Sequence, residues 1–245
     1  MPYLICIVVG IIAGTINVLA GGGSFITLPI LIFLGLPAVD ANGTNRLAVI
    51  AQCISGIWGF HRAGVIEWRW ALAVLAPVVI GSAFGVFASL AIPDFLFRRI
   101  LSLIMLLIAP LAISYRWPIA SQAKPLKSPK SWKMSVIFFG VGLYGGFLQA
   151  GVGFLSLAAT SVAGLDLIRG NGVKLLNVLA LTSLALSAFA GTGHVNWGLG
   201  LALSIGTVTG ALIGVRLTIL AGHRGLKRIV ITTIIVFAIL LWIIE

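Results

Sequence analysis

Two short glycine turns interrupt very apolar stretches of the sequence, and their residue types are suited to binding an anion. Glycine lets a backbone bend and brings its N–H groups close to a ligand. A helix that begins at such a turn directs its positive end and its unpaired N–H groups at that ligand. The alternative is that these glycines only let helices pack closely. The candidate residues are Gly21, Gly22, Gly23 and Ser24 at the first turn, and Gln149, Gly151 and Gly153 at the second.

A second motif places a cation three or four residues after an asparagine. The first copy ends at Arg46 and includes Asn45, and the second copy ends at Lys174. An ionisable residue inside an apolar segment is a candidate functional residue, so Arg46 and Lys174 are candidates to neutralise an anion from two sides. The alternative is that both side chains extend to the membrane surface and pair with Asp40 or Asp166. The asparagine that begins each copy would then simply cap a helix.

The composition places these residues in a membrane protein. Of the 245 residues, 60% are apolar and only 9% are charged, whereas a soluble domain carries about a quarter charged residues. Uncharged apolar runs of about the length of a membrane span occur at 70–92, 175–193 and 229–244. The net charge of +11 is scattered through short loops, which argues against a nucleic-acid-binding protein. The expected partners are therefore the lipid bilayer and a small anion, with no nucleic acid.

The sequence repeats itself after 129 residues without a gap. Asn42-Gly43 aligns with Asn171-Gly172, and a tryptophan and several spaced glycines also align. Such a match indicates two homologous repeats, 1–115 and 134–245, joined by a basic linker, 116–133, which we expect in the cytoplasm. Each repeat is expected to contain a long first segment and then three plainer spans, at 43–60, 70–92 and 97–114 in the first repeat and at 172–190, 197–221 and 226–244 in the second.

The first segment of each repeat is too long for one straight crossing. A continuous helix over 4–36 would be about 48 Å long, against a hydrocarbon core of ~30 Å. We therefore expect two half-length helices that meet at the glycines and form a re-entrant hairpin, with two full crossings as an alternative. Either way each repeat crosses the membrane an odd number of times, which inverts the second repeat; a single crossing by the broken segment would make the repeats parallel. The predicted fold is an all-α polytopic membrane protein built from two inverted repeats.

This architecture is typical of secondary transporters, whose site lies near the membrane midplane between the repeats. Signs of an enzyme are weak, because the three histidines fall at loop ends and the sequence has no HExxH or GxSxG motif. Cys6 and Cys53 have no CxxC spacing, which makes a disulfide framework or a zinc site unexpected. We therefore expect no catalytic residue, no metal and no cofactor. Residues 1–20 lack a basic leading region and are expected to belong to the mature protein.

The same motifs resemble the TauE/SafE group of sulfite and organosulfonate exporters. The resemblance rests on segments 14–24, 28–29 and 42–46 in the first repeat and on 145–153, Lys174 and Asn177 in the second. It covers essentially the whole chain and implies an eight-segment permease for small sulfur-containing or organic anions, such as sulfite, sulfoacetate or thiosulfate. It also implies that the glycine turns, Gln149, Asn45, Arg46 and Lys174 contact the substrate.

The acidic residues bear on the direction of transport. All five lie at segment ends or in loops, so no carboxylate within a span is placed to carry a proton. An inside-negative potential of ~100 mV would expel a dianion with about 4.6 kcal/mol. We therefore expect potential-driven export by alternating access from a bacterial inner membrane. The alternatives are an anion channel, a proton-coupled importer or a membrane scaffold, and the sequence is compatible with a homo-oligomer.

Overall fold

The computed structural model describes residues 1–114 and 131–243, with side chains for 1–104 and 131–220. The described residues fold into helices, without a strand among them. The expected basic linker, 116–133, lies outside the described residues apart from 131–133. The helices are α1 (Pro2–Leu19), α2 (Ser24–Phe33), α3 (Ala38–Arg62), α4 (Trp68–Ala73), α5 (Leu75–Ala91), α6 (Asp94–Ser114), α7 (Trp132–Phe147), α8 (Val152–Val162), α9 (Leu167–Gly191) and α10 (Trp197–Ile243).

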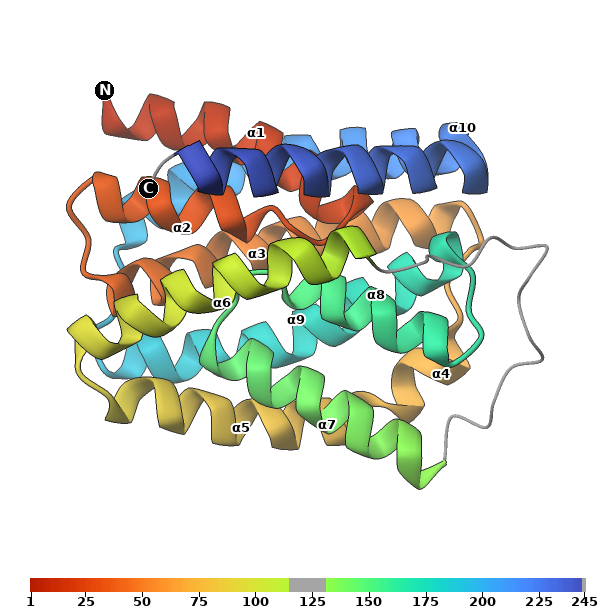
Figure 1. Cartoon of the computed structure of the whole chain (residues 1–245), viewed down its shortest axis with the longest axis horizontal. Coiled ribbons are helices and arrows are strands. Elements are labelled where there is room, and N and C mark those ends of the chain that lie inside the picture. The colour runs from red at the N-terminus through yellow and green to blue at the C-terminus, as the bar shows by residue number, and fades with distance from the viewer. Residues whose placement is uncertain (115–130, 244–245) are drawn as a thin grey trace.

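Both long first segments are broken at their glycines, as predicted. α1 ends at Leu19 and α2 begins at Ser24, while α7 ends at Phe147 and α8 begins at Val152. Gly151 has a φ of +73° at the second break, a left-handed conformation that favours glycine. Figure 1 shows that α1 and α2 form a hairpin that opens at the end of the bundle where the chain starts, whereas the hairpin of α7 and α8 opens at the opposite end.

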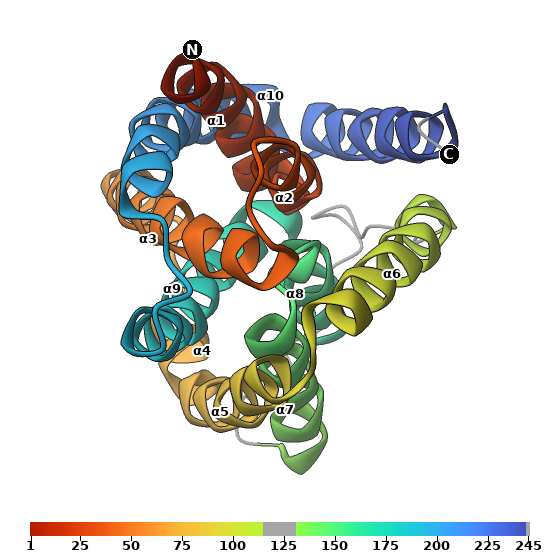
Figure 2. The same cartoon turned by 90° about the vertical axis from the view of Figure 1, so that its left-hand side faces the viewer.

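The two halves of the sequence are interleaved in the bundle. α1 packs along α10, and α5 packs along α7, so each pair takes one helix from each half. α3 and α9 contact each other and lie between these two pairs, as the view in Figure 2 shows. The half-helices α2 and α8 pack on α3 and α9, respectively. These four helices therefore position the candidate site residues.

Several boundaries differ from the sequence-based expectation. α3 and α9 begin at Ala38 and Leu167, so Asn42 and Asn171 lie inside helices, and the alternative that they cap helices is wrong. One expected span is divided at Val74 between α4 and α5. The last two expected spans both fall within the element α10, which turns back toward its starting end in Figure 1.

The start of α9 is held by Asp166, whose Oδ1 accepts hydrogen bonds from the N–H groups of Ile168 at 2.9 Å and Arg169 at 3.0 Å. We expect Asp166→Ala to lower the free energy of unfolding by about 1 kcal/mol, the usual effect of losing such a cap. Asp166→Asn keeps an acceptor oxygen and should change the stability by a few tenths of that. Thermal unfolding of the purified protein in detergent measures both variants. An equal loss in both would show that the carboxylate charge, and not the cap, stabilises the helix.

Within the described residues, three helices are long and apolar enough to cross a membrane, namely Pro2–Leu19, Leu167–Gly191 and the part of α10 from Trp197 to Leu220. Large apolar side chains also remain exposed on the surface of the bundle; Phe87, for example, is 77% exposed. A soluble protein rarely exposes extended apolar surface, whereas lipid tails cover such surface in a membrane protein. The helix lengths and the apolar surface therefore agree with the expected membrane protein.

Candidate binding site at the broken helices

The two glycine turns meet backbone to backbone inside the bundle. A Cβ atom on Gly21 would lie 2.3 Å from the carbonyl carbon of Gly153, and one on Gly153 would lie 2.4 Å from the Cα of Gly21. Next to this contact, the rings of Phe25 and Phe154 stack with their centroids 6.0 Å apart. These two phenylalanines are themselves 129 residues apart in the sequence. The starts of α2 and α8 therefore converge on one place.

Both half-helices begin there without a side-chain cap. The N-cap residues are Gly23 for α2 and Gly151 for α8, and no side chain accepts a hydrogen bond from the first turn at either position. The first N–H groups of a helix have no intrahelical acceptor, and both turns are buried. Carbonyl oxygens of the turns themselves accept hydrogen bonds from several of these groups, as Gly22 does from Phe25 and Gly151 does from Phe154. The two turns therefore bring together the positive ends of two helix dipoles rather than two full sets of free donors.

Arg46 of α3 is completely buried and reaches the end of α7. Its Nη1 donates to the Gly145 carbonyl oxygen at 2.9 Å and to Gln149 Oε1 at 2.8 Å, and its Nη2 donates to the Gly146 carbonyl oxygen at 2.8 Å. Its guanidinium also lies over the ring of Phe189, 5.2 Å from the centroid. The cation thus stabilises the negative, carbonyl end of the α7 dipole, and its Nε has no partner among the described residues.

Lys174 of α9 stabilises the carbonyl end of α1, the helix that precedes the glycine turn in the first half. Its Nζ donates to the carbonyl oxygens of Asn17 at 2.8 Å and Val18 at 3.0 Å, and to Asn171 Oδ1 at 2.5 Å. Asn17 and Val18 are in the last turn of α1. Each half therefore supplies the cation that stabilises the broken helix of the other half.

The alternative that these cations extend to the membrane surface is wrong. Both side chains are buried, with 0% of Arg46 and 1% of Lys174 exposed, and they are the charged residues buried in the described part of the chain. The carboxylates that were their expected partners are used elsewhere, because Asp40 pairs with His194 and Asp166 caps α9. Hydrogen bonds to neutral oxygens leave the two positive charges without a counter-ion among the described residues.

Amide side chains connect the cations to the turns. Gln149 donates from its backbone N–H to Asn42 Oδ1 at 3.3 Å and from Nε2 to Thr182 Oγ1 at 3.3 Å. Asn45 donates from Nδ2 to Ser24 Oγ at 3.1 Å and accepts from Thr27 Oγ1 at 2.7 Å. The structure thus joins Arg46 to Gln149, Asn45 to Ser24, and Gly21 to Gly153, and all the predicted site residues are buried.

Sequence analysis missed the two threonines of this network, Thr27 and Thr182. A hydroxyl in an apolar helix usually bonds to the carbonyl oxygen one turn before it, as that of Thr218 does to Gly214. Such a residue carries no signal of a site in the sequence. The only available hint was spacing, because Thr27 is three residues after the predicted Ser24 and so lies on the same face of α2.

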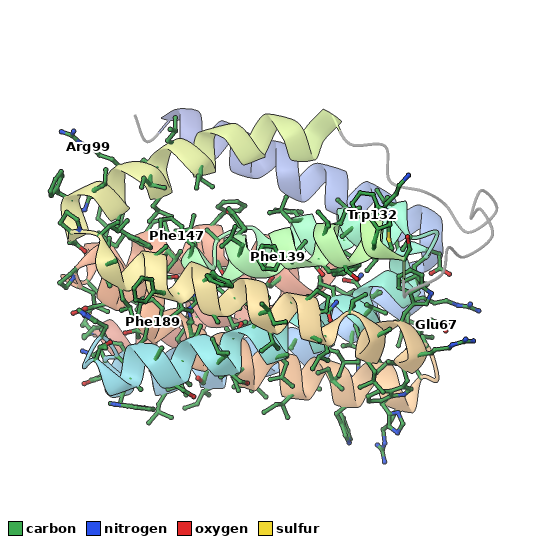
Figure 3. The ribbon with its side chains drawn as sticks, turned by 90° about the horizontal axis from the view of Figure 1, so that it is seen from below. Glu67, Arg99, Trp132, Phe139, Phe147 and Phe189 are labelled. Carbon is green, nitrogen blue, oxygen red and sulfur yellow. The ribbon has the colours of Figure 1, made fainter. Side chains whose placement is uncertain are left out.

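Among the described residues, two side-chain pairs link the halves at the ends of the bundle; we call them the end ion pairs, although the second is ionic only when His194 is protonated. Arg169 Nη1 lies 2.9 Å from Glu67 Oε1, and His194 Nδ1 lies 2.6 Å from Asp40 Oδ1. Arg169 lies in the first turn of α9 and Glu67 in the loop before α4. Asp40 lies in the first turn of α3 and His194 in the loop before α10. α3 and α9 begin at opposite ends, which Arg99 and Glu67 mark in Figure 3. The pairs therefore lie on opposite sides of the buried cations.

Comparison with known proteins identifies the family of this chain. The family described as sulfite exporter TauE/SafE matches residues 6–241 of this chain. The chain belongs to the TauE/SafE family. The resemblance seen in the sequence motifs is thus confirmed, and the match covers both halves and both broken helices.

Proteins similar to this TauE/SafE chain are described as probable membrane transporter proteins. One from Haemophilus influenzae is 28% identical over 240 residues, covering 94% of this chain and 90% of its own. YfcA of Escherichia coli K12 is 28% identical over 238 residues, covering 96% and 87%, and YdhB of Bacillus subtilis is 24% identical over 241 residues, covering 97% and 98%. No solved structure matches the chain. The family and the relatives' names indicate a membrane transporter rather than an enzyme.

Proposed function

We propose that this protein exports a small anion, which binds where α2 and α8 begin. The observation that carries the proposal is the pair of buried cations, Arg46 and Lys174, with no carboxylate partner in the described chain. They lie at the ends of the same broken helices whose following halves begin without caps at Gly23 and Gly151. An anion bound there would balance a positive charge that the protein itself leaves unbalanced.

The substrate class is supported by the family. Its description names sulfite export, and sulfite, sulfoacetate and thiosulfate are small anions whose oxygens accept hydrogen bonds from main-chain N–H groups, arginine and lysine. Arg46, Lys174, Gln149, Asn45 and the glycine turns would contact them. The inside-negative potential of a bacterial inner membrane, which the chain would cross several times, favours export of such anions without a coupled ion.

We infer that the two halves are inverted repeats. Their broken-helix hairpins open at opposite ends of the bundle (Figure 1). Residues related by the shift of 129 positions also adopt the same backbone conformation, since φ is +96° at Gly35 and +97° at Gly164. Phe25 and Phe154, which the same shift relates, stack on each other, as residues beside a two-fold axis can do.

The end ion pairs supply gates for alternating access. In this proposal Glu67 with Arg169 would close the cytoplasmic end, and Asp40 with His194 would close the outer end. An exposed ion pair is worth about 0–1 kcal/mol, so either gate can open at little cost. The close approach of the Gly21 and Gly153 backbones supports a carrier over an open anion channel.

Thermal stabilisation by anions tests the proposal. We expect the purified protein to be stabilised saturably by sulfite, thiosulfate or sulfoacetate, by about 2.7 kcal/mol at a ligand concentration 100 times Kd, and not by chloride. Arg46→Ala and Lys174→Ala should lose this response. Arg69→Ala, which removes an exposed arginine, is the matched control and should retain it. A protein that no anion of the panel stabilises would contradict the proposed function.

A further inference from the structure

Two polar side chains next to the proposed site are buried without hydrogen-bond partners. Asn177 of α9 is 0% exposed, and neither its Nδ2 nor its Oδ1 has a partner among the described residues. The hydroxyl of Ser156 in α8, also 0% exposed, is equally unpaired. Buried polar groups nearly always have a partner, and each exception requires an explanation. The Asn177 amide is therefore suited to a ligand that offers both a hydrogen-bond acceptor and a hydrogen-bond donor.

Contacts on either side place Asn177 beside the start of α8. Two turns earlier on the same face of α9, a Cβ on Gly170 would lie 2.7 Å from Thr160 of α8. One turn later, Leu181 and Val152, the first residue of α8, both approach Gly145; a Cβ there would lie 3.1 and 2.7 Å from them. α8 and α9 run antiparallel (Figure 1), so Asn177 lies level with the first turns of α8.

The other half shows why Ser156 has no partner. The shift of 129 residues relates Ser156 to Thr27 and Lys174 to Asn45. In the first half, the Thr27 hydroxyl donates to Asn45 Oδ1 at 2.7 Å and so has a hydrogen-bond partner. In the second half Lys174 instead reaches α1, where it donates to the carbonyl oxygen of Val18. Lys174 therefore does not give Ser156 the hydrogen-bond partner that the Asn45 amide gives Thr27.

We propose that Asn177 and Ser156 form a subsite for a hydrogen-bond donor carried by the transported anion. The inference rests on the proposed function and adds a preference among anions to it. A fully deprotonated oxyanion offers only acceptors, so it would satisfy Asn177 Nδ2 but not Asn177 Oδ1. An anion that also carries an O–H or N–H group would satisfy both sides of the amide. The subsite thus selects donor-bearing small anions, such as hydroxyalkyl sulfonates, over their alkyl analogues.

A matched pair of probes tests the subsite. 2-Hydroxyethanesulfonate and ethanesulfonate have the same charge and differ in one hydroxyl group. We expect the wild-type protein to bind the hydroxylated probe at least ~10-fold more tightly, because a site built to bond a hydroxyl group discriminates against a ligand without one. Asn177→Leu should remove the difference by weakening the hydroxylated probe alone. Ser156→Ala should reduce the difference and serves as the second variant should Asn177→Leu fail to fold.

Stability without ligand separates this role from a purely structural one. Asn177→Leu removes an unpaired buried amide, so the melting temperature of the ligand-free protein should stay the same or rise. Asn17→Leu is the control, because Asn17 Nδ2 donates to Gln52 at 3.2 Å and its loss should lower that temperature. Wild-type protein that binds both probes equally would overturn the subsite and leave the proposed function standing. Protein that binds neither these probes nor sulfite would contradict the proposed function itself.

Discussion

Gly153→Ala is expected to destabilise the protein by about 3 kcal/mol, the upper end of the usual effect of overpacking. The new Cβ would lie 2.4 Å from the Cα of Gly21. This neighbour is backbone and cannot turn away as a flexible side chain can. The turns at the centre of the bundle would have to separate, and α2 and α8 would move with them. The midpoint of thermal unfolding in detergent measures the loss.

Gly140→Ala is the matched control for this prediction. Gly140 also lies within a helix, α7, but a Cβ there meets no atom within 4 Å. The substitution should therefore stabilise the protein by about 0.5–1 kcal/mol, the usual gain for glycine replaced by alanine inside a helix. Equal melting temperatures for Gly153→Ala and the wild type would show that the starts of α2 and α8 do not meet as described.

Cross-linking either end ion pair is expected to stop transport completely and reversibly. With cysteines at positions 67 and 169, or at 40 and 194, a short disulfide-forming cross-linker would hold one gate shut. Alternating access requires each gate to open in turn, so one fixed gate is sufficient to stop turnover. Efflux of radiolabelled sulfite from proteoliposomes, before and after reduction, measures the effect. The native Cys6 and Cys53 are buried and free, which keeps them from the reagent.

Single-cysteine variants provide the control, because the reagent can modify them without bridging the gate. They should retain transport, and the cross-linked proteins should still be stabilised by anion from the side that remains open. Continued efflux through a protein with both gates cross-linked would refute alternating access at these pairs. It would point to a channel that passes elsewhere through the bundle.

The breaks in the first segments could be predicted because the sequence shows them directly. A run such as Gly21–Gly23 in the middle of a long apolar segment is a poor helix centre, whatever surrounds it. Burial of Arg46 and Lys174, which lie at the heads of apolar spans, was one of two alternatives that the sequence left open. These inferences needed only local composition and the spacing of the repeat.

The partners of the two cations could not be predicted. Arg46 and Lys174 bond mainly to main-chain carbonyl oxygens, and every residue of every sequence has such an oxygen. Which carbonyl groups are free depends on where α1 and α7 end and on how the halves interleave. The pairing of α1 with α10 and of α5 with α7 is equally absent from the sequence pattern. The sequence suggested carboxylate partners for the two cations, which was wrong because the sequence does not show where free main-chain carbonyl groups will lie.

The exchange of cations between the halves has a consequence for how the chain is made. Arg46 finds its acceptors 99 to 103 residues later, at Gly145, Gly146 and Gln149. While the ribosome is still producing the first half, its arginine is in an apolar helix with none of these oxygens available. The carbonyl groups at the end of α1 bond to Lys174, which is still further away in the sequence. The interior can close only after both halves have entered the bilayer, so neither half, synthesised alone, can complete its own broken helix.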